Sequence, residues 1–258
     1  MSYPTRIYGN SGDHLRVTST LRCPLGTPME FEDGRVFHYS EGGASDLAIA
    51  KLMQQAVVQS NHDVDITVTT DATSGLYPAI GDKAITITTQ AVLTKDQYKD
   101  GYIFVDSGTG LGQMAQIKSH PAESTGAASC KITLYDHDAL VTALDATSDV
   151  GLRLNLYDGV IINPQAAATG VPIGVTPRAV DVSVAKYFWL QTWGPCLVLT
   201  NGSLLVGKAV CPSATTDGAI DVYPLNSADA SGQQPVVGWV MTVASSTEYS
   251  LVYLTIAP

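Results

Sequence analysis

The sequence predicts an all-β protein built from β-sandwich or barrel-like domains, and three patterns indicate this fold class. Short segments that alternate apolar and polar residues recur along most of the chain, as in strands with one buried face. Turn pairs containing glycine separate these segments, and a single aromatic run opens the C-terminal region. The expected strands lie around residues 66–69, 85–88, 132–134, 152–156 and 252–256.

The N-terminal residues 1–29 contain several glycines and prolines but little periodicity, which indicates an extended arm or a set of turns. A disordered terminus is the alternative reading. This segment carries Arg6, Arg16 and Arg22 against Asp13 alone, whereas the rest of the chain has a net charge of −12. The sequence therefore predicts a weakly basic arm on an acidic body.

One substantial helix is expected near residues 45–60. Ser45 is a favourable N-cap, and apolar residues follow at helical spacing. The segment Asn61-His62-Asp63 would end the helix. The residues that form the apolar stripe are Leu47, Ile49, Leu52, Met53, Ala56 and Val57.

The aromatic run of residues 186–195 predicts a central strand, or one pressed against a partner subunit. Large residues occupy both the odd and the even positions of this run. Because successive side chains of a strand point to opposite faces, each face would have bulky groups to bury. One face would carry Tyr187, Trp189, Gln191 and Trp193, and the other Phe188, Leu190 and Thr192. Further along, Asn201-Gly202 between apolar segments 197–199 and 204–206 predicts a β-hairpin.

Residues 163–170, which include the stretch Ala166-Ala-Ala-Thr-Gly170, are typical of a linker or crossover. The expected organisation is therefore an arm at 1–29, a β-rich domain with one helix at 30–163, and a C-terminal sandwich or barrel-like domain at 164–258. At 258 residues the chain is long enough for one large or two smaller domains.

Composition excludes some classes of function. The net charge of −10 argues against general nucleic-acid binding, which requires lysine and arginine for phosphate contacts. Only 15 % of the residues are charged, against roughly 25 % in an average globular protein, which suggests surface buried against other proteins. No signal peptide or apolar run of membrane-spanning length is present, so synthesis in the cytoplasm and no membrane partner are expected. Cys23, Cys130, Cys196 and Cys211 have no metal-ligand spacing and are expected to be buried free thiols.

No motif demands catalysis. Gly108, Gly110 and Gly112 follow an expected strand, but their spacing and the short interval before Pro121 favour a glycine-rich hairpin over a dinucleotide site. The clusters His62/Asp63/Asp65 and Asp136/His137/Asp138 could each offer ligands to a divalent ion, or simply cap local turns. No nucleophile elbow is present, and a hydrolytic site assembled in space stays open. We therefore expect no enzyme, no catalytic residue and no cofactor.

Several longer segments resemble a group of tailed-bacteriophage virion proteins, over roughly residues 25–258. These segments are Leu25–Tyr39, Gly101–His120, Tyr187–Pro195, Pro235–Met241 and Glu248–Leu254. The resemblance implies a structural virion component, and we expect a capsid decoration (cement) protein on the outer capsid surface. Its partners would be the major capsid protein and further copies of itself, as a trimer by analogy with shell three-fold positions.

Large apolar anchors and the basic arm would supply the contacts of such a protein. The candidate contact residues are Arg6, Arg16, Arg22, Trp189, Trp193 and Trp239. Two alternatives remain at this stage: a tail, neck or fibre component that recognises host glycans, and a virion-bound glycan hydrolase, which would need convergent carboxylates. The tryptophans could also belong to the chain's own core.

Overall fold

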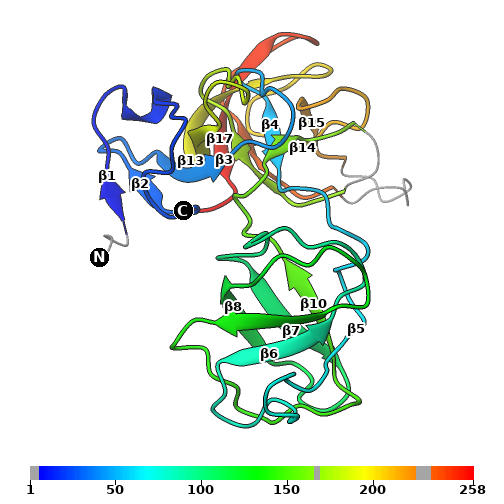
Figure 1. Ribbon diagram of the computed structural model, residues 1–258. Helices are drawn as coiled ribbons and strands as arrows, with labels where there is room; N and C mark the ends of the chain where they lie inside the picture. The colour runs from blue at the N-terminus through cyan, green and yellow to red at the C-terminus, as the bar shows by residue number, and fades with distance from the viewer. Residues whose placement is uncertain (1–5, 166–168, 225–233) are drawn as a thin grey trace. The chain divides into compact units, whose positions relative to one another are not determined.

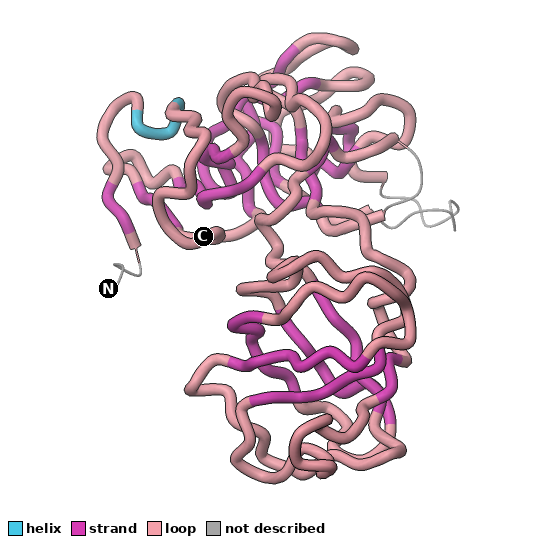
Figure 2. The backbone as a smooth tube through the Cα atoms, viewed as in Figure 1, coloured by secondary structure: helices cyan, strands magenta, loops and turns pink. Residues whose placement is uncertain are grey.

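The computed structural model describes residues 6–165, 169–224 and 234–258, and the chain forms two compact units (Figures 1 and 2). Unit 1 comprises Met1–Val57 and Leu156–Pro258, and unit 2 comprises Val58–Asn155. Strands dominate both units. The helical content of the described residues is the short 3₁₀ turn η1, Asp13–Leu15. The all-β fold class is confirmed.

Unit 2 is an insertion into unit 1, so the chain leaves unit 1 after Val57 and re-enters it at Leu156. The sequence-based boundary between 163 and 164 does not coincide with this division. The linker expected there includes residues 166–168, which lie outside the described residues. No helix of the described residues has the length and apolar character needed to cross a membrane.

Unit 1 contains an 11-stranded sheet, whose main path runs β1-β2-β3-β13-β17-β16-β14-β15. Off this path, β12 pairs with both β13 and β4, and β11 pairs with β4. The strands on the main path are β1 (Ile7–Tyr8), β2 (Pro28–Glu30), β3 (Val36–Glu41), β13 (Tyr187–Leu199), β14 (Ala209–Pro212), β15 (Ile220–Val222), β16 (Gly238–Val240) and β17 (Tyr249–Thr255). The others are β4 (Leu52–Gln54), β11 (Ile161–Ile162) and β12 (Pro172–Val175).

Strand β13, formed by the aromatic run, is the central strand that the sequence predicts. Its first part pairs with β3 and its second part with β17, so it organises the sheet from both sides. Phe188 and Trp189, on opposite faces, are both buried. The register shifts between Gln191 and Trp193, and the Gln191 side-chain amide donates hydrogen bonds to the carbonyls of Trp193 and Pro195 across this irregularity. Beyond it, Trp193, Pro195 and Leu199 are partly buried and Leu197 is exposed.

Unit 2 is a near-closed six-stranded barrel with the order β5-β10-β7-β8-β9-β6. An isolated bridge between Val68 and Ile87 connects the two ends of this order. A single apolar cluster fills it, with Ile66, Ile117 and Leu134 fully buried. The strands are β5 (Ile66–Thr67), β6 (Ala84–Thr88), β7 (Tyr102–Ser107), β8 (Met114–Ser119), β9 (Ser129–Leu134) and β10 (Asp149–Arg153).

The glycine-rich segment joins β7 to β8 as a hairpin, as the sequence predicts over a dinucleotide site. Gly108 and its neighbours Gly110 and Gly112 all adopt positive φ angles. A Cβ at Gly108 would lie 1.8 Å from the backbone oxygen of Thr147. The glycine therefore allows two backbone segments to approach closely, which is a packing role.

The helix expected near residues 45–60 is absent, and that prediction was wrong. The segment forms β4, with Leu52 and Met53 fully buried, and Ala50 adopts a φ of 54° that a helix cannot contain. Pairing of β4 with β11 and β12 satisfies its backbone, and Leu47 bridges to Val180. Tertiary pairing has overridden a pattern compatible with helix, because short apolar runs fit both periodicities.

The N-terminal segment is not a free arm over its described residues 6–29. Strand β1 pairs in parallel with β2, and Thr18 exchanges two backbone hydrogen bonds with Tyr187 of β13. His14 packs against the rings of Phe31 and Phe37. The chain between β1 and β2 therefore crosses this group of strands and returns, as a folded part of unit 1 (blue in Figure 1).

The hairpin expected at Asn201-Gly202 also does not form. A turn is present, with Gly202 at a φ of 82°, but residues 204–206 lie outside the strands and Leu204 bridges instead to Ala244. Strand β13 takes β17 as its partner there, because β17 provides a longer apolar run to pair with Leu197 and Leu199. The residues Asn201-Gly202 thus predicted the turn correctly, but the prediction of which strands pair on either side of it was wrong.

Candidate functional site

Two surfaces of unit 1 bring together most of the contact residues predicted from the sequence. We name them the arginine pocket and the aromatic face. The arginine pocket is a hollow of about 510 Å³ lined by Ile7, Asp13, Arg16, Thr18, Arg22, Cys23, Met29, Tyr39 and Trp189. The aromatic face consists of Trp193, Leu197, Trp239, Tyr249 and Tyr253 on strands β13, β16 and β17.

Adjacent strands build the floor of the arginine pocket. Ile7 of β1 lies opposite Met29 of β2 in the sheet register, and Tyr39 of β3 lies opposite Trp189 of β13. Met29, Tyr39 and Trp189 belong to one apolar cluster with Cys23. The segment that crosses these strands contributes the rim, which contains Arg16 and Arg22. The fold therefore places guanidinium groups beside an apolar and aromatic floor.

The polar groups of this pocket are few and ordered. The Tyr39 hydroxyl lies 3.1 Å from the Thr18 hydroxyl and accepts a hydrogen bond of 3.3 Å from the Arg22 amide. Burial raises the pKa of Tyr39 and that of the Cys23 thiol, so both groups stay protonated at neutral pH. Neither is therefore prepared to act as a nucleophile.

The arginines differ in how far they are neutralised. Arg6 forms an ion pair with Glu30, next to the pocket. Arg16 approaches Asp13 at 3.4 Å, yet its side chain is 75 % exposed. Arg22 is exposed, and its guanidinium forms no ion pair within the described ranges. The rim consequently keeps positive charge accessible on a chain whose net charge is −10.

The aromatic face is formed by side chains that are neighbours across paired strands. Tyr253 lies opposite Pro195 on one side and opposite Trp239 on the other, while Leu197 lies opposite Leu251. The Trp193 and Tyr253 rings meet edge to face at 6.0 Å. The exposed fractions are 51 % for Leu197, 50 % for Trp239, 47 % for Tyr249 and 36 % for Tyr253.

This face carries no charge. Strands β13, β16 and β17 contain neither acidic nor basic residues, and Met241 extends the exposed apolar surface beyond β16. Exposed apolar surface of this kind is typical of interaction sites. Tryptophan and tyrosine also dominate the energetically important positions of protein interfaces.

The sequence pointed to Trp189, Trp193 and Trp239 but not to several other residues of these surfaces, such as Tyr249 and Tyr253. The structure divides the three tryptophans: Trp189 is buried in the pocket floor, Trp193 is partly buried and Trp239 is half exposed. The alternation of Tyr249, Leu251 and Tyr253 could have indicated a second aromatic strand. Tyr39 and Trp189 are 150 residues apart in the sequence but are opposite each other where β3 pairs with β13. Nothing in the sequence could have predicted this pairing.

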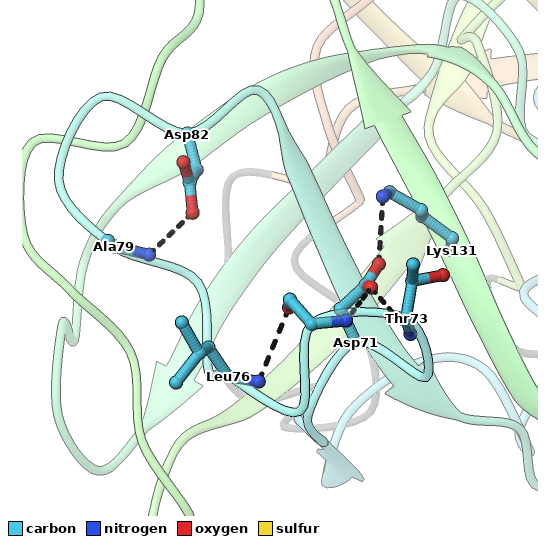
Figure 3. Close-up of polar contacts among 7 residues, drawn as sticks. Asp71, Thr73, Leu76, Ala79, Asp82 and Lys131 are labelled. Carbon is cyan, nitrogen blue, oxygen red and sulfur yellow. Dashed lines mark hydrogen bonds and ion pairs between the residues drawn. The ribbon is translucent and has the colours of Figure 1, made fainter.

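A second hollow, in unit 2, has a volume of about 680 Å³ and a mixed polar and apolar lining. Its acidic residues Asp71 and Asp82 are occupied by local contacts (Figure 3). Asp71 accepts hydrogen bonds from the amides of Thr73 and Ser74 and pairs with Lys131 at 2.8 Å, and Asp82 accepts one from the Ala79 amide. The Lys131 contact and the turn amides lower the pKa of Asp71 to about 2. A glycosidase acid requires the opposite shift, so Asp71 is a turn-stabilising residue.

The two His/Asp clusters do not converge on metal sites. The His62 ring is buried and its Nδ1 lies 2.8 Å from the Tyr98 hydroxyl, whereas Asp63 forms an ion pair with Arg153 and the Asp65 backbone bonds to Asp106. Over residues 6–165, 169–224 and 234–258, no three His, Cys, Asp or Glu side chains are arranged to hold a metal ion.

The other cluster and the cysteines likewise have structural surroundings. Asp136 is exposed between Lys83 and Lys118, while the Asp138 carboxylate accepts a hydrogen bond from the Gln116 amide. All four cysteines are buried and unbridged. Burial raises the pKa of Cys130, Cys196 and Cys211, which keeps these thiols neutral.

Comparison with known proteins gave no relatives: no protein-family model matches the chain, and no curated protein and no solved structure shows significant similarity to it.

Proposed function

We propose that this chain is a non-enzymatic structural protein of a tailed-bacteriophage virion, and that it decorates the outer capsid surface and reinforces the head. The observation that carries the proposal is the uncharged aromatic face on β13, β16 and β17. The resemblance of residues 25–258 to phage virion proteins supplies the biological setting.

The aromatic face is proposed to bury itself against the major capsid protein at capsomer junctions. Trp239 and Tyr253 lie opposite each other in the register and would act together as anchors. The rest of the chain, with its net charge of −10, would stay solvated and keep the particle surface soluble. A trimer on three-fold positions is the proposed arrangement, by analogy with proteins of this class.

Substituting Trp239 with glutamate is expected to weaken attachment to heads by roughly 30-fold or more, since central aromatic anchors contribute about 2 kcal/mol or more. Half of the side chain is exposed, so the substitution should leave folding intact. The measurement is the occupancy of capsids that lack the protein, as a function of added protein concentration.

Two variants control this experiment. Trp239→Phe retains an aromatic anchor and should bind within a few fold of the natural protein. Val184→Glu places the same charge on another exposed apolar residue of unit 1 and should leave occupancy unchanged. Equal occupancy by W239E and the natural protein would remove the aromatic face from the proposal.

A tail or fibre component that recognises host glycans is the second candidate. The hollow of unit 2 favours it, because Tyr77 and lysine and hydroxyl side chains line that hollow. Copy number separates the two roles: a decoration protein covers the shell, while a fibre occurs only at the tail or the unique vertex.

A further inference from the structure

We infer that the arginine pocket is a peptide-binding site, which takes an acidic segment of a partner chain and holds one of its large apolar side chains. This goes beyond the proposed function, which the aromatic face carries.

The hollow has the size and the lining of a ligand site. Its volume of about 510 Å³ falls within the usual range for such sites. Trp189 and Met29 are already buried by the fold, so the floor is held in place before any ligand arrives. Register pairing of Ile7 with Met29 and of Tyr39 with Trp189 fixes these side chains on adjacent strands. A ligand would therefore meet a preformed apolar surface.

The rim determines the charge of the ligand. Arg16 and Arg22 present guanidinium groups against the single carboxylate of Asp13. Guanidinium groups recognise carboxylates through paired, charge-assisted hydrogen bonds. The chain is otherwise acidic, so positive charge gathered on the rim of one apolar hollow selects an anionic ligand.

A peptide is the ligand that fits both features. One aromatic or large aliphatic side chain would fill the space above Trp189, and carboxylates on either side of it would reach Arg16 and Arg22. Because the rim carries a positive charge, the segment of the partner that binds there should be acidic.

The test uses the full purified chain and a defined probe, the N-acetylated amide Asp-Glu-Phe-Glu-Asp, titrated while the Trp189 indole resonance is followed by NMR. We expect saturable binding in the millimolar range or tighter. A probe with glycine in place of phenylalanine and a probe with lysine and arginine in place of the acidic residues should each bind roughly tenfold more weakly or worse.

Variants then locate the site. R16E/R22E should weaken binding of the acidic probe by roughly tenfold or more, and the neutral R16A/R22A should give a smaller loss of the same sign. K95E/K99E makes the same charge change at exposed lysines of unit 2 and should stay within about twofold of the natural protein. The melting temperature of each variant shows whether it is folded.

Three results would overturn the inference: no saturable binding of the acidic probe, equal affinity for the acidic and basic probes, or equal losses in K95E/K99E and R16E/R22E. Because no capsid is present, these outcomes are independent of whether Trp239 attaches the protein to a head. The pocket and the proposed function can therefore fail separately.

Discussion

Residues 58–155, expressed alone, are expected to fold into a stable six-stranded barrel with a single cooperative unfolding transition. The apolar cluster that fills the barrel is drawn entirely from this segment, from Ile66 to Leu152. For a domain of this length, the heat-capacity change on unfolding should be about 1.2–1.5 kcal/mol/K. Calorimetry and the dispersion of amide resonances provide the measurement. A fragment with no cooperative transition would contradict the division into two units.

Paired core substitutions in the full chain sharpen this prediction. Ile117→Ala, in the barrel core, should lower the stability of the unit 2 transition by about 2–5 kcal/mol and leave unit 1 unchanged. Leu254→Ala, in an apolar cluster of unit 1, should do the reverse. If both substitutions shift one common transition equally, the chain unfolds as a single cooperative body.

Stability is expected to fall as the pH drops from about 6.5 to about 4, and His38 should account for much of the loss. His38 is buried against Tyr157, with ring centroids 4.8 Å apart, and its Nδ1 lies 3.0 Å from the Thr192 hydroxyl. Burial, with a smaller contribution from the charge of Arg6, lowers the pKa of His38 to about 4. The unfolded chain binds the proton more readily in this interval, so the contribution is complete above pH 6.5 and lost toward pH 4.

The size of this effect follows from the difference between the two pKa values, and corresponds to roughly 3 kcal/mol of unfolding free energy. His38→Gln should reduce the slope of stability against pH in denaturant titrations. Burial also lowers the pKa of His14 and His62, so a smaller slope will remain in H38Q. Identical slopes in H38Q and the natural protein would show that His38 is not responsible.

The fold class was predictable from the sequence because strand periodicity is a local property. The aromatic run identified β13 as a central strand, because its large side chains point to both faces of the strand and must be buried on both. The helix predicted near residues 45–60 was wrong because a local pattern cannot show strand pairing. Leu47, Leu52 and Met53 match a helical stripe, but pairing with distant strands determines the conformation of this segment. Partners distant in sequence determine such short elements.

The candidate surfaces were predictable only in part. Arg16, Arg22 and Trp189 were named from charge and size, but their meeting in one pocket depends on the chain between β1 and β2 crossing the sheet. Trp193 and Trp239 were named as anchors without the tyrosines of β17 that join them into one face. Residue type indicated which side chains could form a binding surface. The pairing of strands determined which of these side chains lie on the same surface.

Cryo-electron microscopy of the purified virion, with icosahedral symmetry imposed, tests the proposed function most directly. We expect density for this chain at regular positions on the outer shell, with the strands carrying Trp239 and Tyr253 facing the major capsid protein. Density confined to the tail or to the unique vertex would contradict the decoration role and support the glycan-recognising alternative.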